Sequence, residues 1–221
     1  TGVCHIYHKK FEDWTNDRLL EYIAEPTDDR LYAIAQLIRG GVDLVLIYNR
    51  TKIDMFFLEK FKNIVEFERV VEAAPMDIEV LREAKRMGFS DKFIGQLWGV
   101  SQHDMYLLRE KNGIFPVYKM IDTCASEFSS YVPYFYSTYE DENESQVSDK
   151  EKIVVLGSGP IRIGQGVEFD YSTVHAIWSI REAGYEAIII NNNPETVSTD
   201  YTTSDKLSVS YTHLRAHETR G

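Results

Sequence analysis

Residues 152–207 constrain the fold of this chain more than any other part of it. They begin with an apolar run of strand length that is rich in β-branched side chains, Ile153 to Leu156. A glycine-rich turn follows, then a helical pattern that ends at Gly184, then a second apolar run over residues 187–190. This order predicts a β-α-β unit, the start of a parallel α/β sheet. Polar residues follow both runs, at the strand ends where open α/β sheets bind ligands.

The turn between the first run and the helix contains four glycines, Gly157, Gly159, Gly164 and Gly166. A dinucleotide-binding fingerprint needs a third glycine where this chain has Arg162, and a P-loop needs a lysine where it has Gln165. The glycines therefore indicate a tight turn and close packing of helix on sheet rather than a nucleotide site. The turn and helix start also carry a polar set that needs partners or a polar cavity, namely Arg162, Gln165, Glu168 and Asp170.

Two motifs in this stretch carry a specific resemblance, GSGPIRIGQGVEFDY at 157–171 and NNNPETVSTDYTTSDKL at 191–207. Together they resemble the large subunit of carbamoyl phosphate synthase, at the opening of its second, carbamoyl-phosphate-forming half. Residues 117–145 resemble the segment before that half, and residues 27–68 resemble the helical oligomerisation domain between the two halves. The resemblance extends from about Val3 to Leu207.

The resemblance implies an enzyme that makes carbamoyl phosphate, for arginine or pyrimidine biosynthesis, from bicarbonate, glutamine-derived ammonia and two ATP. It implies a cytoplasmic ligase whose partners are a small glutamine amidotransferase subunit and other copies of the large subunit. The family binds ATP with magnesium or manganese in two ATP-grasp modules, and neither module is present in this chain. We therefore expect no catalytic residue, no metal site and no cofactor in the chain itself, and no synthase activity from it alone.

The same resemblance implies a role in the path that carries carbamate between the two halves. Glu168 and Glu195 stand at the motif positions of glutamates that line or gate this tunnel, and Arg162 could offer them a counter-charge. Simpler roles stay open, a favourable charge in the first helical turn for Glu168 and a turn residue after proline for Glu195. Ile161 stands where many relatives have asparagine, which weakens any hydrogen-bonding role for that position.

Most of the chain before residue 150 has a helical pattern. Asp28, Asp43, Asp54, Asp77, Ser90 and Ser101 each precede an apolar periodic segment and are predicted to cap a helix. The segments around Gly41 and Gly88 repeat one another, which predicts a small duplicated helical domain. Residues 113–145 are rich in aromatic side chains but irregular, and we expect a linker there.

The repeats also mimic a helix-turn-helix, so a regulatory helical domain fused to a Rossmann-type nucleotide-binding module is the rival hypothesis. The predicted recognition helix, which begins at Gln102, carries mixed charges, and the whole chain of 221 residues has a formal net charge of -11. DNA affinity depends on lysine and arginine contacts to phosphates, so we expect no nucleic-acid partner. Apolar runs of membrane-spanning length are absent, so we expect no membrane contact.

These observations predict an α+β chain in three parts. Residues 1–148 form an all-α oligomerisation domain with its linker. Residues 149–207 form the first β-α-β of a doubly wound, Rossmann-like pre-ATP-grasp domain. We attribute residues 208–221 to a translated sequencing adapter, so His213 and His217 are not expected to bind metal.

Overall fold

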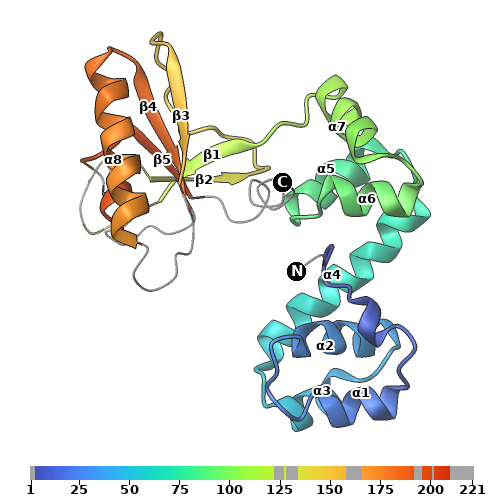
Figure 1. The fold of residues 1–221 in the computed structure, drawn as a ribbon. Helices are drawn as coiled ribbons and strands as arrows, with labels where there is room; N and C mark the ends of the chain where they lie inside the picture. Colours follow the sequence, from blue (N-terminus) through green and yellow to red (C-terminus); the bar gives the residue numbers. More distant parts are fainter. Residues whose placement is uncertain are drawn as a thin grey trace. The chain divides into compact units, whose positions relative to one another are not determined.

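A computed structural model describes residues 3–121, 127, 134–157, 166–191, 196–200 and 202–209. The chain divides into two compact units, residues 1–115 and residues 116–221. Helices form the first unit, and a mixed sheet with one long helix forms the core of the second (Figure 1). The predicted α+β fold class, a helical domain followed by an α/β domain, is therefore confirmed.

The first unit consists of short helices that begin at polar capping residues. In chain order they are η1 (Lys9–Phe11), α1 (Asn16–Tyr22), α2 (Arg30–Arg39), α3 (Leu44–Thr51), α4 (Met55–Ala73), α5 (Ile78–Arg86), α6 (Asp91–Trp98) and α7 (Gln102–Lys111). Five predicted caps accept a hydrogen bond from a backbone N–H of the first turn: Asp43, Asp54, Asp77, Ser90 and Ser101. Each such bond satisfies an amide that the helix itself leaves unpaired.

The cap predicted at Asp28 is wrong. Helix α2 begins at Arg30, with Asp29 at the N-cap and no side-chain capping bond. The Asp29 carboxylate instead accepts hydrogen bonds from Lys10 Nζ (2.6 Å), Tyr22 Oη and Thr27 Oγ1. Burial opposes ionisation of Asp29, but these donors outweigh it and lower its pKa to about 2. The Asp29 carboxylate is therefore bound by Lys10, Tyr22 and Thr27 rather than by a backbone N–H of α2.

The duplication predicted from the sequence is present in the helices. Helices α3 and α4 start at residues 44 and 55, and α6 and α7 start 47 residues later, at 91 and 102. The turns correspond as well, because Gly41 (φ 77°) matches Gly88 (φ 88°) and Lys52 (φ 57°) matches Gly99 (φ 68°). The two copies are joined through α4, whose Val71 carbonyl accepts a hydrogen bond from the Trp98 indole at 2.6 Å.

The second unit is built on a five-stranded sheet of order β1-β2-β5-β4-β3. Its strands are β1 (Val117–Met120), β2 (Tyr134–Thr138), β3 (Lys152–Leu156), β4 (Glu186–Ile190) and β5 (Lys206–Val209). Strands β2, β5, β4 and β3 are parallel neighbours, and β1 pairs antiparallel with β2. The predicted β-α-β unit is β3, α8 (Gly166–Glu182) and β4, and η2 (Val197–Thr199) lies between β4 and β5.

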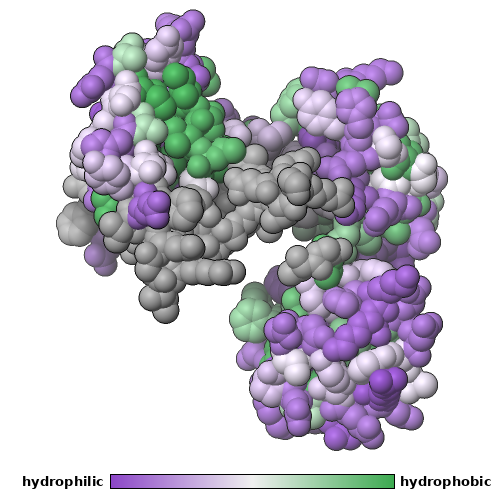
Figure 2. All heavy atoms as spheres, viewed as in Figure 1, coloured by the Kyte–Doolittle hydropathy of each residue, from purple (hydrophilic) through white to green (hydrophobic). Residues whose placement is uncertain are grey.

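Helix α8 covers one face of this sheet (Figure 1), and the opposite face carries apolar side chains. Ile177 of α8 is fully buried against Ile189 and Leu207. On the opposite face, Val154 and Leu156 are 49% and 50% exposed, and Figure 2 shows apolar side chains gathered over β3 and β4. A parallel sheet normally has helices on both faces, so this unit displays a surface that suits further packing.

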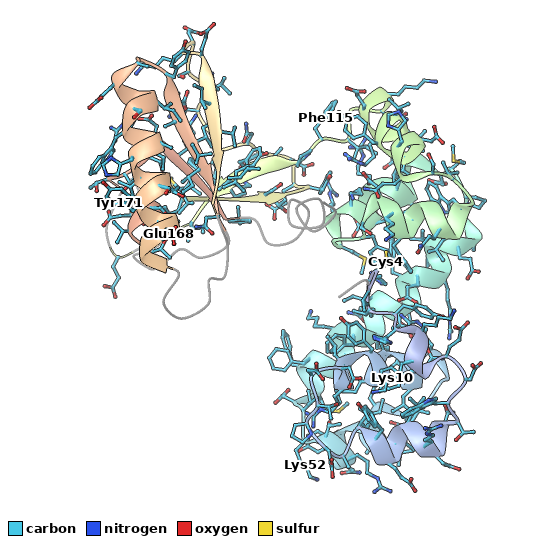
Figure 3. The ribbon with its side chains drawn as sticks, in the orientation of Figure 1. Cys4, Lys10, Lys52, Phe115, Glu168 and Tyr171 are labelled. Carbon is cyan, nitrogen blue, oxygen red and sulfur yellow. The ribbon has the colours of Figure 1, made fainter. Side chains whose placement is uncertain are left out.

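The linker expected before residue 148 instead contains two strands of the sheet. The helical unit ends at Phe115 (Figure 3), and β1 and β2 belong to the second unit. These strands are only four and five residues long and are dense in aromatics, so neither shows a clear alternating pattern. On the outer edge of β1, Glu144 donates its backbone N–H to Tyr118 O, and its carboxylate accepts from Met120 N. The acidic segment 140–144 therefore lies, through Asn143 and Glu144, along an edge of β1 that would otherwise be open to another strand.

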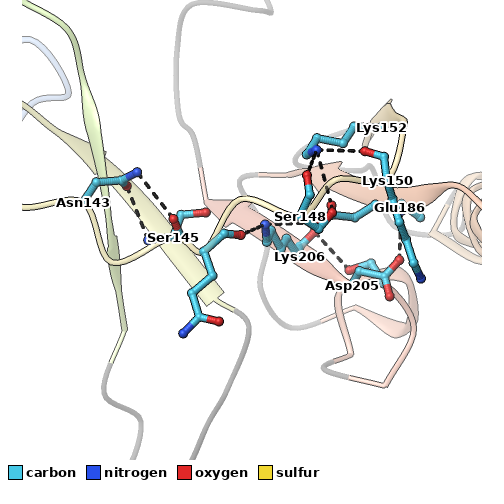
Figure 4. Close-up of polar contacts among 11 residues, drawn as sticks. Asn143, Ser145, Ser148, Lys150, Lys152, Glu186, Asp205 and Lys206 are labelled. Atoms are coloured by element: carbon cyan, nitrogen blue, oxygen red, sulfur yellow. Dashed lines mark hydrogen bonds and ion pairs between the residues drawn. The ribbon is translucent and has the colours of Figure 1, made fainter.

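A buried carboxylate attaches residues 146–150 to the amino ends of the strands (Figure 4). Glu186 is 5% exposed, accepts a hydrogen bond from Ser148 Oγ, and lies 2.8 Å from Lys206 Nζ and 3.8 Å from Lys152 Nζ. Burial works against its ionisation, but these partners outweigh burial and hold the pKa of Glu186 below its usual value. Lys206 Nζ also donates to Gln146 O, so the segment before β3 is fixed to the sheet.

Candidate functional site

The candidate site lies at the carboxyl ends of β3, β4 and β5, where the sequence predicted ligand-binding loops. Gly157 donates its N–H to Ile190 O at 2.8 Å, and Asn191 donates its N–H to Ser208 O at 3.1 Å. The three strands therefore end side by side. Asn191 is 3% exposed, so a polar side chain is buried at the carboxyl end of β4.

Gly157 is required by the close approach of Asn191. A Cβ at position 157 would lie 2.7 Å from the Asn191 side chain, closer than real Cβ contacts allow. The glycine at this position thus serves packing at the strand end, as the sequence suggested for the turn as a whole. Gly166 begins α8, while Gly159 and Gly164 lie outside the described residues.

One of the three predicted tunnel residues lies in the described part of the chain. Glu168 is in the first turn of α8, and its side chain is exposed (Figure 3). A carboxylate there interacts favourably with the positive end of the helix dipole, which is also its simplest structural role. Arg162 and Glu195 lie outside the described residues, so their predicted roles stay predictions.

Asp170 connects the start of α8 with the loop that follows Glu195. Its Oδ2 accepts a hydrogen bond from Val197 N at 2.9 Å, and its Oδ1 accepts one from Ser198 Oγ at 2.6 Å. Ser198 is 1% exposed and its hydrogen bond to Asp170 is partly buried, whereas Val197 is 69% exposed and its hydrogen bond to Asp170 is open to solvent. The sequence indicated that Asp170 needs partners but did not predict which ones, because the partners are 27 and 28 residues away in the chain.

The loop held by Asp170 is also fixed from within and at its far end. Thr196 and Thr199 form a reciprocal capping box around η2. Thr203 Oγ1 donates to Val197 O at 3.1 Å. Arg181, at the end of α8, donates to the carbonyls of Thr202 and Thr203 at 3.1 and 3.0 Å. Residues 196–200 and 202–203 are therefore attached to α8 near both of its ends.

The predicted recognition helix of the rival hypothesis uses its arginine internally. Arg109 of α7 is 7% exposed and binds Asp91 of α6 through Nε and Nη2, at 2.7–3.0 Å. Lys85 Nζ lies 3.0 Å from Asp91 Oδ1 and donates to Phe89 O at 2.7 Å. Burial lowers the pKa of Lys85, which Asp91 only partly offsets. These two cations stabilise the packing of α5, α6 and α7 and are not available to phosphates of DNA.

The first helical copy has a solvent-facing apolar surface. Its α3 and the start of α4 expose large side chains, Val45, Leu46, Tyr48, Phe56 and Phe57. A cavity of about 550 Å³ lies in the same copy, with Ile38, Leu44 and Val65 among its apolar lining and Lys62 and Arg69 among its charged lining. Large exposed apolar surfaces of this kind mark sites of protein association.

Two further observations concern the described residues only. None of the helices there combines the length and the apolar character needed to span a bilayer. In the same residues, no group of three or more His, Cys, Asp or Glu side chains could hold a metal ion.

Comparison with known families gives two matches along the chain. Residues 1–113 match the oligomerisation domain of the carbamoyl-phosphate synthetase large chain. Residues 149–218 match the preATP-grasp domain of carbamoyl phosphate synthase. The first match covers 113 of the 221 residues, just over half of the chain. The second match extends into residues 208–221, whose attribution to an adapter stays a prediction.

Proposed function

Because this chain belongs to the carbamoyl-phosphate synthetase large-chain family, we propose that it forms part of the large subunit of a glutamine-dependent carbamoyl phosphate synthase. In the complete cytoplasmic enzyme, bicarbonate and glutamine-derived ammonia are converted to carbamoyl phosphate at the expense of two ATP. The observation that carries the proposal is the order of the two matched domains on one chain, an oligomerisation domain followed by a preATP-grasp domain.

The proposal assigns ATP and its magnesium or manganese to parts of the enzyme outside this chain. The glycine loop has Gln165 where a P-loop has its phosphate-binding lysine, so these residues do not fit a nucleotide phosphate. No step assigned to this chain uses ATP or a metal ion. The small amidotransferase subunit, as the source of ammonia, belongs to the same proposal.

The α/β unit contributes part of the path that carries carbamate to the second half. Carbamate is a labile anion that hydrolyses in water, so its path must exclude bulk solvent. Two features support this role: strands β3, β4 and β5 end side by side, and Asp170 attaches the segment after Glu195 to the start of α8, near Glu168 in sequence. In this proposal Glu168 and Glu195 gate the path, and Arg162 balances their charge.

The helical unit contributes assembly with other copies of the large subunit. Its match to an oligomerisation domain and the exposed apolar side chains of α3 and α4 support that role. The internal use of Arg109 and Lys85 is what a packing domain requires, and it argues against the rival DNA-binding function.

The test compares the full-length large subunit with this chain. We expect the full-length protein, combined with its amidotransferase subunit, to convert labelled bicarbonate into carbamoyl phosphate when glutamine and ATP are supplied. We expect the chain of 221 residues to form none and to hydrolyse no ATP. A full-length protein without carbamoyl phosphate formation would contradict the proposed enzyme, and ATP turnover by the short chain would contradict the assignment of ATP to other parts.

A further inference from the structure

We infer that Asp170 is a positioning residue for the carbamate path, which it serves by holding the loop after β4 against the start of α8. This inference rests on the proposed function. Asp170 is not among the residues assigned to the gate, yet its side chain joins the two motif segments through Val197 and Ser198. One of its contacts is to a backbone amide, so it fixes the course of the loop as well as a side chain.

Both hydrogen bonds that Asp170 accepts come from residues at the beginning of η2. Val197 N is the first amide of this short helix and Ser198 Oγ follows it directly, at 2.9 and 2.6 Å from the two carboxylate oxygens. A carboxylate that accepts two hydrogen bonds from one turn restrains that turn more strongly than a neutral acceptor, because charge-assisted bonds are shorter and stronger. The restrained turn begins two residues after Glu195.

Asp170 itself is close in sequence to the other predicted gate residue, Glu168. Asp170 is two residues after Glu168 on the same helix, α8, so its position relative to Glu168 is fixed by helix geometry. Val197 and Ser198 are correspondingly close in sequence to Glu195. Asp170 therefore fixes Val197 and Ser198 against the helix that carries Glu168, and each of its carboxylate oxygens accepts one hydrogen bond from this turn.

At the far end of the loop, Arg181 holds the backbone through hydrogen bonds to carbonyl groups. Arg181 donates to two carbonyls, of Thr202 and Thr203, and its side chain is 42% exposed. It therefore fixes residues that lead into β5 rather than those that follow the gate. Loss of Asp170 should release the start of the loop while the Arg181 contacts keep its end in place.

If the start of the loop is released from α8, the enzyme should consume ATP without forming carbamoyl phosphate. Carbamate that escapes from its path reacts with water to give bicarbonate and ammonia, so the first ATP is consumed without product. Loss of one charge-assisted hydrogen bond shifts a local equilibrium by about tenfold or more. A variant that opens the path should therefore use more ATP for each carbamoyl phosphate, while bicarbonate-dependent ATP hydrolysis continues.

The experiment measures ATP consumed per carbamoyl phosphate formed in the complete enzyme, with Asp170→Asn in the full-length large subunit. We expect this ratio to rise at least about twofold, because an uncharged amide makes weaker hydrogen bonds to Val197 N and Ser198 Oγ than the carboxylate does. Glu182→Gln is the matched control, since it makes the same chemical change at an exposed position of α8, and its ratio should equal that of the wild type. Ser198→Ala removes the hydroxyl that donates to Asp170 but keeps the hydrogen bond from Val197 N. It should therefore raise the ratio less than Asp170→Asn does.

The outcomes separate this inference from the proposed function. An active wild type with an unchanged ratio in Asp170→Asn and Ser198→Ala would overturn only the role of Asp170. Parallel loss of ATP hydrolysis and carbamoyl phosphate in both variants would indicate a general structural role and would also overturn it. A wild type that forms no carbamoyl phosphate would overturn the proposed function, and this inference with it.

Discussion

Asp91 joins two buried cations, Arg109 and Lys85, in the second helical copy. Its carboxylate binds Arg109 through two guanidinium nitrogens and lies 3.0 Å from Lys85 Nζ, and both cations are 7% exposed. Removing one member of a buried ionic group leaves the others without compensation in a medium that solvates them poorly. Removing one member of this group is therefore expected to destabilise the protein by more than the net stability that the intact group contributes.

We expect Asp91→Asn to lower the free energy of unfolding of the helical unit by about 3 kcal/mol at neutral pH. Urea unfolding followed by Trp98 fluorescence, in a background that carries Trp14→Phe and Trp178→Phe, would measure this, because Trp98 is 9% exposed at the end of α6. Glu66→Gln serves as the control, since Glu66 forms only an exposed pair with Lys62 at 3.6 Å, and it should change stability by less than about 0.5 kcal/mol. Equal effects of the two substitutions would show that burial of the Asp91 group is unimportant.

The same group makes stability depend on pH in a defined direction. Burial alone would raise the pKa of Asp91, but Arg109 and Lys85 outweigh it and hold the pKa below its ordinary value of 3.8. The folded state therefore binds a proton less readily than the unfolded chain, so the stabilisation is complete above pH 3.8 and is lost as pH falls through the folded-state pKa. Urea midpoints of wild type and Asp91→Asn should converge in that acid range, and a constant difference between them would contradict the linkage.

At the scale of elements, the duplication places the same turn, after α3 and after α6, in each helical copy, so the two turns can be compared. Both short helices end in a left-handed residue, Lys52 after α3 and Gly99 after α6. A residue with a Cβ is strained in this conformation, whereas glycine is not. The first copy therefore carries a local cost that the second copy avoids, at positions with the same place in the fold.

We expect Lys52→Gly to stabilise the helical unit and Gly99→Ala to destabilise it, each by about 1 kcal/mol. No atom lies within 4 Å of a Cβ built on Gly99, so the second effect isolates backbone strain from crowding. Lys52→Ala is the control, because it removes the Lys52 contact with the Tyr48 ring but keeps the strain. Thermal unfolding would measure all three, and a gain in Lys52→Ala equal to that in Lys52→Gly would locate the effect in the side chain.

Elements that depend on local signals could be predicted from the sequence, and those that depend on distant partners could not. The caps at Asp43 and Ser90 and the β-α-β unit follow from residues within one turn or one strand. The start of α2 was misplaced because Asp29 binds Lys10 instead of its own helix. The short strands β1 and β2 became evident only through their pairing in the sheet.

The candidate site shows the same division. The sequence predicted that two loops leave neighbouring strand ends, and Gly157 and Asn191 lie there. It also singled out Asp170 as a group in need of partners. It could not predict that Val197 and Ser198 are those partners, because the η2 turn has no pattern that points to α8. Contacts between side chains far apart in the chain require the folded geometry.

At the scale of the whole molecule, the two units differ in how completely they bury their apolar residues. The first helical copy surrounds a closed core that includes Ile34, Leu37 and Leu58, each 0% exposed. The sheet of the second unit has one face covered by α8 and leaves Val154 and Leu156 about half exposed on the other. In the proposed synthase, the rest of the α/β domain would cover this open face.

This difference predicts that one substitution, Leu156→Lys, has little effect on the stability of the short chain but a large effect on that of the full-length protein. In the chain of 221 residues, Leu156→Lys should change the melting temperature little and reduce aggregation on heating, because the side chain is already 50% exposed. In the full-length protein the same lysine would be buried and should destabilise the α/β domain by roughly 3 kcal/mol. Ile189→Lys, on the face covered by α8, should unfold the unit in both contexts. Thermal unfolding with light scattering would measure each variant, and a full-length protein that tolerates Leu156→Lys as well as the short chain does would mean that this face stays open in the assembled enzyme.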